Sequence, residues 1–341
     1  MNLARHGEEW RMVVDGDAAA GEGSLRARAG NRARLRFDLA YLRLPAPRDS
    51  DAKDDRTVDP RSLPAVELRA RAFEYKRRSF GELDFAAAPD AQGWRIDRLN
   101  LTRPELRIAV DGVWRRRGTR DGSEFNISWN SDDMGASLDA LGFPDQMVKG
   151  KVSMQAQLAW PGAPSDPELA GMNGNIEVTA ENGRFLKLDP GAARLFGLLD
   201  LRSIGRYLTL DFSPAFGKGF AFDAIHGKIV VDRGNARTKD LVVSGPSLSL
   251  GVAGRVGLAT EDYDLAIVTS PRIGSTLTLT SWGLFGPQVA AAVLAFQSLF
   301  KRQIQEGART TYLVKGPWEN PRVTKLEKPA AAQPAPAEPA Q

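Results

Sequence analysis

The chain has 341 residues, of which 42% are hydrophobic and 26% charged, a globular composition that allows two or three structural units. It has no cysteine, which excludes disulfide frameworks, thiolate zinc sites, iron–sulfur clusters and cysteine nucleophiles. The two histidines, His6 and His226, are too far apart to form a local ligand pair, so we expect no metal site. The formal net charge is +4, but basic residues alternate with apolar or acidic ones, a pattern that argues against nucleic acid as a partner.

Residues 1–44 are expected to form the amino-terminal β strands. Between Leu25 and Tyr41, apolar residues take odd positions and arginines take even ones, and a period of two is typical of a strand. Residues 45–64 hold four prolines and nine charged side chains, which predicts a flexible loop. Residues 1–17 show no basic leader followed by an apolar run, so they predict neither a signal peptide nor a membrane anchor.

Residues 65–165 repeat short alternating runs separated by turn residues such as Asp111 with Gly112, and they predict an antiparallel β meander. A short helix is expected over 133–141, where Gly142 stops it. The alternation continues through 166–327. There, Asn182 with Gly183 predicts a hairpin turn, because a type I′ turn needs positive φ at both central residues.

Two further helices are expected in the carboxy-terminal part, near 190–204 and near 287–306. The second lies in a charge-free segment, 273–300, which Pro287 and two glutamines interrupt. These interruptions favour a helix that lies in an interface or on a hydrophobic sheet over one that spans a bilayer. Residues 328–341, rich in proline and alanine, predict a disordered tail.

No motif in the sequence supports catalysis. The Gly-Lys dipeptides lack the rest of a phosphate-binding loop, and no GxSxG elbow occurs. Acidic pairs such as Asp54 with Asp55 and Asp132 with Asp133 lie in turn-like stretches and are interpreted as turn and cap residues. We therefore expect no enzyme activity, no catalytic residue and no cofactor.

Many amphipathic strands with few helices pose a burial problem, because each apolar strand face must be covered. Two sheets packed face to face would cover it. A strongly curved open sheet whose inner face is filled by acyl chains would also cover it. Periodicity alone does not separate these two solutions.

Residues 176–321 resemble the carboxy-terminal region of the AsmA-like, YhdP-type envelope proteins of Gram-negative bacteria, which are relatives of TamB. The resemblance is carried, in order, by NGRFLKLDPGAARLFGLLDLRSIGRYLTLDF, KGFAFDAIHGKIVVDRGNARTKDLVVSGPSLSLGVAGRVGLATEDYDLAIVTSPRIGS and YLVKGPWENPRV. Residues 66–162 resemble the preceding region of that family through GWRIDRLNLTRPELRIAVDG, SDDMGASLDALGF and LAWPGAP.

The resemblance implies a mainly β fold: a long curved antiparallel sheet, an open taco-like groove, with two or three short helices. It also implies phospholipid transport through the periplasm between inner and outer membranes, with acyl chains sliding along the groove and head groups at its wet opening. Family members are anchored in the inner membrane by an amino-terminal transmembrane helix. This sequence shows no such helix and is short, so we expect it to be the carboxy-terminal portion of a longer protein.

The candidate groove-lining residues are the alternating apolar positions of the carboxy-terminal part. They are Ile176, Val178, Ile229, Val231, Val243, Leu248, Leu250, Val252, Leu265 and Ile267. The candidates for membrane contact are Trp282, Leu284, Phe285, Val293, Phe296 and Phe300. The alternatives are a dry core between sheets for the first set and a helix capping the open end of the sheet for the second.

Two other classes of function stay open. The protein could be a non-catalytic scaffold for outer-membrane protein assembly whose sheet edges pair with client strands. It could also be a cytosolic binding module built as a closed sandwich. The partners expected on the first reading are phospholipids, the outer membrane, and the inner membrane through the missing anchor.

Overall fold

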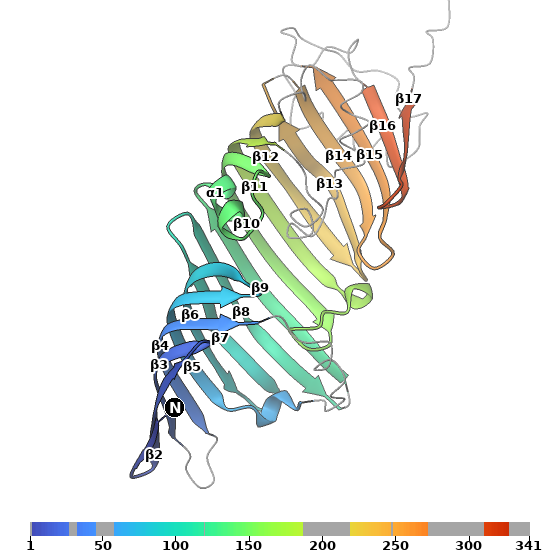
Figure 1. The fold of residues 1–341 in the computed structure, drawn as a ribbon. Helices are drawn as coiled ribbons and strands as arrows, with labels where there is room; N and C mark the ends of the chain where they lie inside the picture. The colour runs from blue at the N-terminus through green and yellow to red at the C-terminus, as the bar shows by residue number, and fades with distance from the viewer. Residues whose placement is uncertain are drawn as a thin grey trace, which may run out of the picture.

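The computed structural model describes residues 2–26, 33–45, 58–118, 120–186, 219–246, 248–271 and 310–326. These residues form one sheet of 17 strands with one α-helix and two short 3₁₀ turns (Figure 1). The strands of the amino-terminal half are β1 (Asn2–His6), β2 (Glu9–Gly16), β3 (Ala19–Arg26), β4 (Arg34–Leu44), β5 (Ala65–Tyr75), β6 (Arg78–Pro89), β7 (Gly93–Thr102), β8 (Leu106–Arg117) and β9 (Arg120–Ser131). Those of the carboxy-terminal half are β10 (Met147–Pro161), β11 (Asn173–Phe185), β12 (Phe220–Asp232), β13 (Asn235–Ser244), β14 (Leu248–Gly257), β15 (Asp262–Pro271), β16 (Thr310–Pro317) and β17 (Arg322–Leu326).

Each strand pairs with the next strand in the chain, so the described strands form a single layer with β1 and β17 at its two edges. Neighbouring strands lie about 4.8 Å apart, which extends the sheet over roughly 80 Å. The mainly β, long, open sheet that the family resemblance implies is confirmed, and the closed sandwich is wrong for the described strands because they belong to one sheet. The expected segments 1–44, 65–165 and 166–327 all contribute strands to it.

One pair departs from the antiparallel expectation. Strands β4 and β5 run parallel, with Arg34 opposite Ala65 and Leu44 opposite Tyr75. A parallel neighbour requires a connection of a dozen or more residues that returns along the length of the strand. The segment 45–64 between them has that length, and its described end contains a 3₁₀ turn, η2 (Pro60–Ser62).

The alternating run from Leu25 to Tyr41 is not one strand but parts of β3 and β4. Residues 27–32 separate them, and Leu25 of β3 lies opposite Leu35 of β4. Because cross-strand partners share a face, the alternation keeps the same phase on both sides of the connection. The pattern therefore identified the apolar face correctly and the strand boundary wrongly.

The two glycine turns expected within the sheet are also wrong. Asn182 has φ +53°, but Gly183 does not share it, and β11 continues through both to Phe185. Gly112 lies inside β8, where an added Cβ would be 2.2 Å from the backbone oxygen of Glu124. Both glycines permit a close approach within the sheet rather than a reversal of the chain.

The short helix is confirmed as α1 (Met134–Ala140). Asp133 caps it by accepting the backbone N–H of Ala136 at 3.0 Å, and Gly142 follows it with φ +81°. Met134 and Leu138 of the helix pack with Leu106 and other apolar residues of the sheet. The helix thus covers part of the apolar face at one rim of the sheet (Figure 1).

The helices expected near 190–204 and 287–306, the charge-free segment and the tail 328–341 lie outside the described residues. Within the described part of the chain, no helix is long and apolar enough to cross a membrane.

The opposite face of the sheet carries ion pairs between neighbouring strands. Arg36 of β4 contacts Glu67 of β5 at 2.6 Å, and Arg115 of β8 contacts Glu124 of β9 at 2.7 Å. Near the carboxy-terminal end, Arg255 of β14 donates hydrogen bonds to Asp262 of β15, one of them at 3.0 Å. These bonds lower the pKa of the Asp262 carboxyl below its ordinary value, against the burial that raises it.

This pair predicts a pH-dependent effect of Arg255→Met. Because the pKa of Asp262 is lowered in the folded state, the pair stabilises the fold above the ordinary carboxyl pKa of about 4, and that contribution is lost as the pH falls through the lowered value. We expect Arg255→Met to reduce the free energy of unfolding by about 1 kcal/mol at pH 7 and by little once Asp262 is protonated. Thermal unfolding of both proteins from pH 7 to pH 2 measures this.

The matched control is Arg237→Met, because Arg237 pairs with Asp232 at 3.3 Å through side chains that are both 48% exposed. Its effect should be small at every pH. A loss for Arg255→Met that stays constant with pH would instead assign the effect to the hydrogen bond from Arg255 to the amide oxygen of Asn235 at 3.1 Å, which does not titrate.

Candidate binding groove

Strand register aligns apolar side chains into a continuous row across the sheet. The row joins β4 to β12 through directly opposed residues. In order these residues are Phe37, Leu68, Phe85, Leu99, Val110, Ile127, Ala156, Ile176 and Ile229. A strand places alternate residues on opposite faces, so the charged neighbours of this row point the other way.

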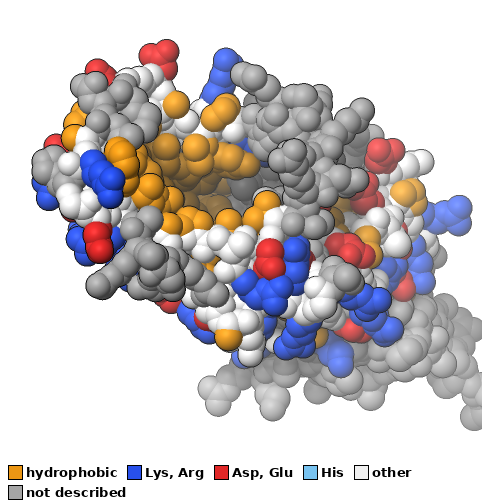
Figure 2. Space-filling model, turned by 90° about the horizontal axis from the view of Figure 1, so that it is seen from below, with side chains coloured by type: hydrophobic (Ala, Val, Ile, Leu, Met, Phe, Trp, Pro, Cys, Tyr) orange, Lys and Arg blue, Asp and Glu red, His pale blue; other side chains and the backbone are white. Residues whose placement is uncertain are grey.

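The apolar face is the concave one. In Figure 2 hydrophobic side chains line a hollow, whereas lysine, arginine, aspartate and glutamate lie on its rim and on the outside. The curved single layer therefore forms a groove with an apolar interior and a charged exterior.

Exposure of the apolar face changes along the groove. Its middle part, over β7–β11, contains a set of side chains that remain partly exposed beside buried ones such as Phe125 and Ala156, and we call the partly exposed set the accessible floor. The accessible floor comprises Leu99, Ile108, Val110, Ile127, Trp129, Met154, Leu158, Ile176 and Val178. Over β15 and β16, by contrast, Leu265 and Ile267 are each 2% exposed and Val314 is 0% exposed. The groove is thus open in the middle and closely packed towards its carboxy-terminal end.

The structure places the candidate lining residues of β11–β15 as follows. Ile229, Val231, Val252, Leu265 and Ile267 are buried in one cluster, against which Ile176 and Val178 pack while partly exposed. Val243 lies opposite Leu250, and Leu248 of β14 is paired with Pro271. Contact of these residues with lipid stays a prediction. The six candidates for membrane contact lie outside the described residues.

Most of the accessible floor was not among the candidates. It comes from strands β7–β10, whose alternation is visible in runs such as Phe125-Asn-Ile-Ser-Trp129. Periodicity marks which side chains share a face but not how open that face is, because openness depends on what packs over it. The candidates came from the part of the chain with the stronger family resemblance.

Three tryptophans line one rim of the groove on its apolar face, and we call them the tryptophan rim. Trp94 of β7 lies opposite Trp114 of β8, and both Trp114 and Trp160 of β10 lie opposite Ser123 of β9. Trp94 Nε1 donates to the backbone oxygen of Pro64 at 2.9 Å, and Trp160 Nε1 donates to that of Ala163 at 3.1 Å. The described residues place no acceptor near the buried Nε1 of Trp114.

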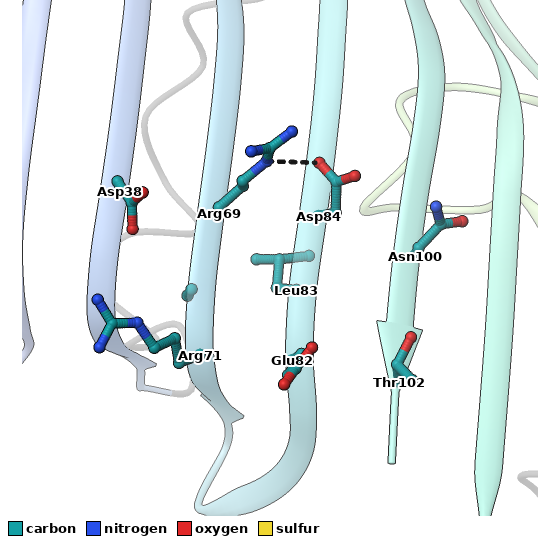
Figure 3. Close-up of a pocket in the computed structure, with 9 residues that line it drawn as sticks. Asp38, Arg69, Arg71, Glu82, Leu83, Asp84, Asn100 and Thr102 are labelled. Carbon is teal, nitrogen blue, oxygen red and sulfur yellow. Dashed lines mark ion pairs between the residues drawn. The ribbon is translucent and has the colours of Figure 1, made fainter. Parts of the chain in front are cut away.

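A shallow depression of about 380 Å³ lies on the outer face (Figure 3). Arg69 and Asp84 form an ion pair there at 3.8 Å, beside Asp38, Arg71 and Glu82. Charges of both signs alternate across it, as expected of a solvated sheet face. No group of three or more His, Cys, Asp or Glu in the described residues could hold a metal ion.

The tryptophan rim predicts a difference between two matched substitutions. Trp160→Phe and Trp114→Phe remove the same atoms, but only the first removes a hydrogen bond that the protein makes, and the second removes an unpaired donor. We expect Trp160→Phe to be less stable than Trp114→Phe by about 1 kcal/mol or more in delipidated protein. Urea unfolding measures the difference. Equal losses would mean that Trp114 finds an acceptor in solution.

Comparison with known proteins gives one family and one curated relative. The family model described as YhdP protein matches residues 1–323. A curated protein of Escherichia coli (strain K12), the intermembrane phospholipid transporter YhdP, is 24% identical over 272 residues. The match covers 78% of this chain but 21% of that protein, so the chain spans about a fifth of its relative's length. No solved structure matches the chain.

Proposed function

The chain belongs to the YhdP protein family, and from this premise we propose that its concave face carries the acyl chains of phospholipids passing between two membranes. The observation that supports this most is the accessible floor: a run of partly exposed apolar side chains on a face that a single-layer sheet leaves without a second sheet. Apolar surface in water costs roughly 25 cal/mol per Å². Acyl chains would remove that cost without any bond being made, so the proposed function is non-catalytic.

The curated relative is named an intermembrane phospholipid transporter, and the match covers 21% of its length. We propose that this chain is one segment of a longer conduit in the bacterial envelope, reaching through the periplasm from an inner-membrane anchor towards the outer membrane. The sheet contributes roughly 80 Å at about 4.8 Å per strand. The charged outer face keeps such a segment wetted on the outside while the groove stays apolar within (Figure 2).

The test is native mass spectrometry with lipid extraction on the full chain purified without detergent. We expect several phospholipids per chain. Val178→Asp, which puts a carboxylate on the accessible floor, should reduce bound lipid by about tenfold or more, because burying an unpaired charge costs several kcal/mol. The matched control is Thr179→Asp, since Thr179 is exposed on the outer face of the same strand.

A lipid-free wild-type chain, or equal lipid loss in both variants, would contradict the proposal. Recovery of unfolded outer-membrane protein strands in place of lipid would favour the alternative function, a scaffold for membrane-protein assembly. Circular dichroism of both variants shows whether the sheet is retained.

A further inference from the structure

The two rims of the groove differ in chemistry. One is the tryptophan rim, at the end of β8 and β10 and the start of β7. At the other rim, α1 and the residues after it pack over the apolar face, with Leu106, Met134, Leu141, Phe143 and Met147 all buried. The buried cluster there is built of aliphatic, thioether and phenyl side chains. The polar groups beside it pair locally, since Ser137 Oγ lies 2.8 Å from Ser131 Oγ and Arg103 donates to Glu105 at 2.6 Å. The feature that distinguishes the two rims is the group of three indoles.

Two of the three indoles of the tryptophan rim, those of Trp94 and Trp160, direct their N–H groups to the strand ends, whereas the Nε1 of Trp114 is buried. Trp94 and Trp160 donate to backbone oxygens of Pro64 and Ala163, which precede or follow the strands rather than lie within them. Their ring systems pack inward, where Trp94 meets Phe85 at a centroid distance of 5.8 Å and Trp160 meets Phe125 at 5.4 Å. An indole whose N–H is hydrogen-bonded at the edge of an apolar region while its ring packs inside that region is typical of the boundary between an apolar phase and polar head groups.

Polar groups continue beyond the tryptophan rim. Arg116 forms a double hydrogen bond to Asp121 at 2.6 and 2.8 Å, and these side chains are 12% and 16% exposed. Asp59 and Arg61 at η2 form a further pair at 2.7 Å. From the accessible floor outward, the order on this side is therefore apolar floor, tryptophan, fixed charges, which parallels the order of acyl chain, ester and phosphate in a phospholipid.

We propose that phospholipids lie in the groove with one polarity: head groups and ester carbonyls at the tryptophan rim, acyl chains across the accessible floor towards α1. This rests on the proposed function, which it deepens by fixing how the substrate is oriented. Trp129 lies on the α1 side, because it packs against the cluster that contains α1. Trp129 is directly opposite Met154 of β10. Met154 precedes Trp160 by six residues, so at about 3.3 Å per residue Trp129 and Trp160 lie about 20 Å apart along the strand direction.

The test is fluorescence quenching in two single-tryptophan proteins, one keeping Trp160 and one keeping Trp129, with the other tryptophans changed to phenylalanine. Each is loaded with phosphatidylcholine that carries a nitroxide on the head group, or with phosphatidylcholine brominated near the methyl ends of its chains. We expect the head-group nitroxide to quench Trp160 at least twice as strongly as Trp129. The bromines near the methyl ends should give the reverse order.

The outcomes separate the two proposals. Absence of quenching by either lipid at both positions would overturn lipid binding itself. Quenching with the reversed order, or with no difference between Trp160 and Trp129, would overturn the orientation while leaving the groove in place. If the single-tryptophan proteins do not fold, ¹⁹F spectra of the unsubstituted chain labelled with fluorotryptophan, with signals assigned by single Trp→Phe changes, give the same comparison.

Discussion

The structure depends on one constraint: among the described residues, a sheet one layer thick has an apolar face that no second sheet covers. Every described strand belongs to that layer, and the directly opposed apolar residues from Phe37 to Ile229 make the uncovered face continuous across nine strands. In water such a face is unfavourable in proportion to its area. Curvature removes part of the cost by turning the face inward, and α1 removes more by packing over one rim. The remainder, the accessible floor, needs an apolar occupant, and this need is the physical basis for assigning lipid to the groove.

The carboxy-terminal end and the middle of the groove differ in how far their apolar side chains are covered. Towards the carboxy-terminal end, Tyr263, Leu265 and Ile267 are at most 2% exposed, so that end behaves as a protein core. Over β7–β11 the same face includes side chains that remain partly exposed. An apolar segment that is packed at one end and open in its middle is suited to holding chains that enter along the groove. The outer face contributes in another way, because cross-strand pairs such as Arg36 with Glu67 tie neighbouring strands together and keep the exterior polar.

Sequence periodicity was sufficient for the strands and their apolar face, and end signals were sufficient for α1, because these depend on local alternation and on the cap at Asp133. The single open sheet was implied by the family resemblance, because periodicity alone did not separate it from a sandwich. It was insufficient where distant strands decide the outcome. The parallel pairing of β4 with β5 depends on the path of a long connection, and Asn182 with Gly183 continues a strand because β12 pairs across it. The accessible floor and the tryptophan rim were missed because exposure depends on three-dimensional packing. A signal for the rim was present: Trp94, Trp114 and Trp160 each stand close to a glycine or proline turn.

The central claim is that acyl chains lie on the concave face, and residue-level photocrosslinking tests it most directly. The full chain is loaded with a phospholipid that carries a diazirine in its acyl chain, irradiated, and mapped by peptide mass spectrometry. The account predicts adducts on alternate residues of β9–β11, at Ile127, Met154 and Val178 but not at their outward neighbours Ser128, Gln155 and Thr179. Adducts spread equally over both faces, or confined to segments outside the sheet, would contradict it.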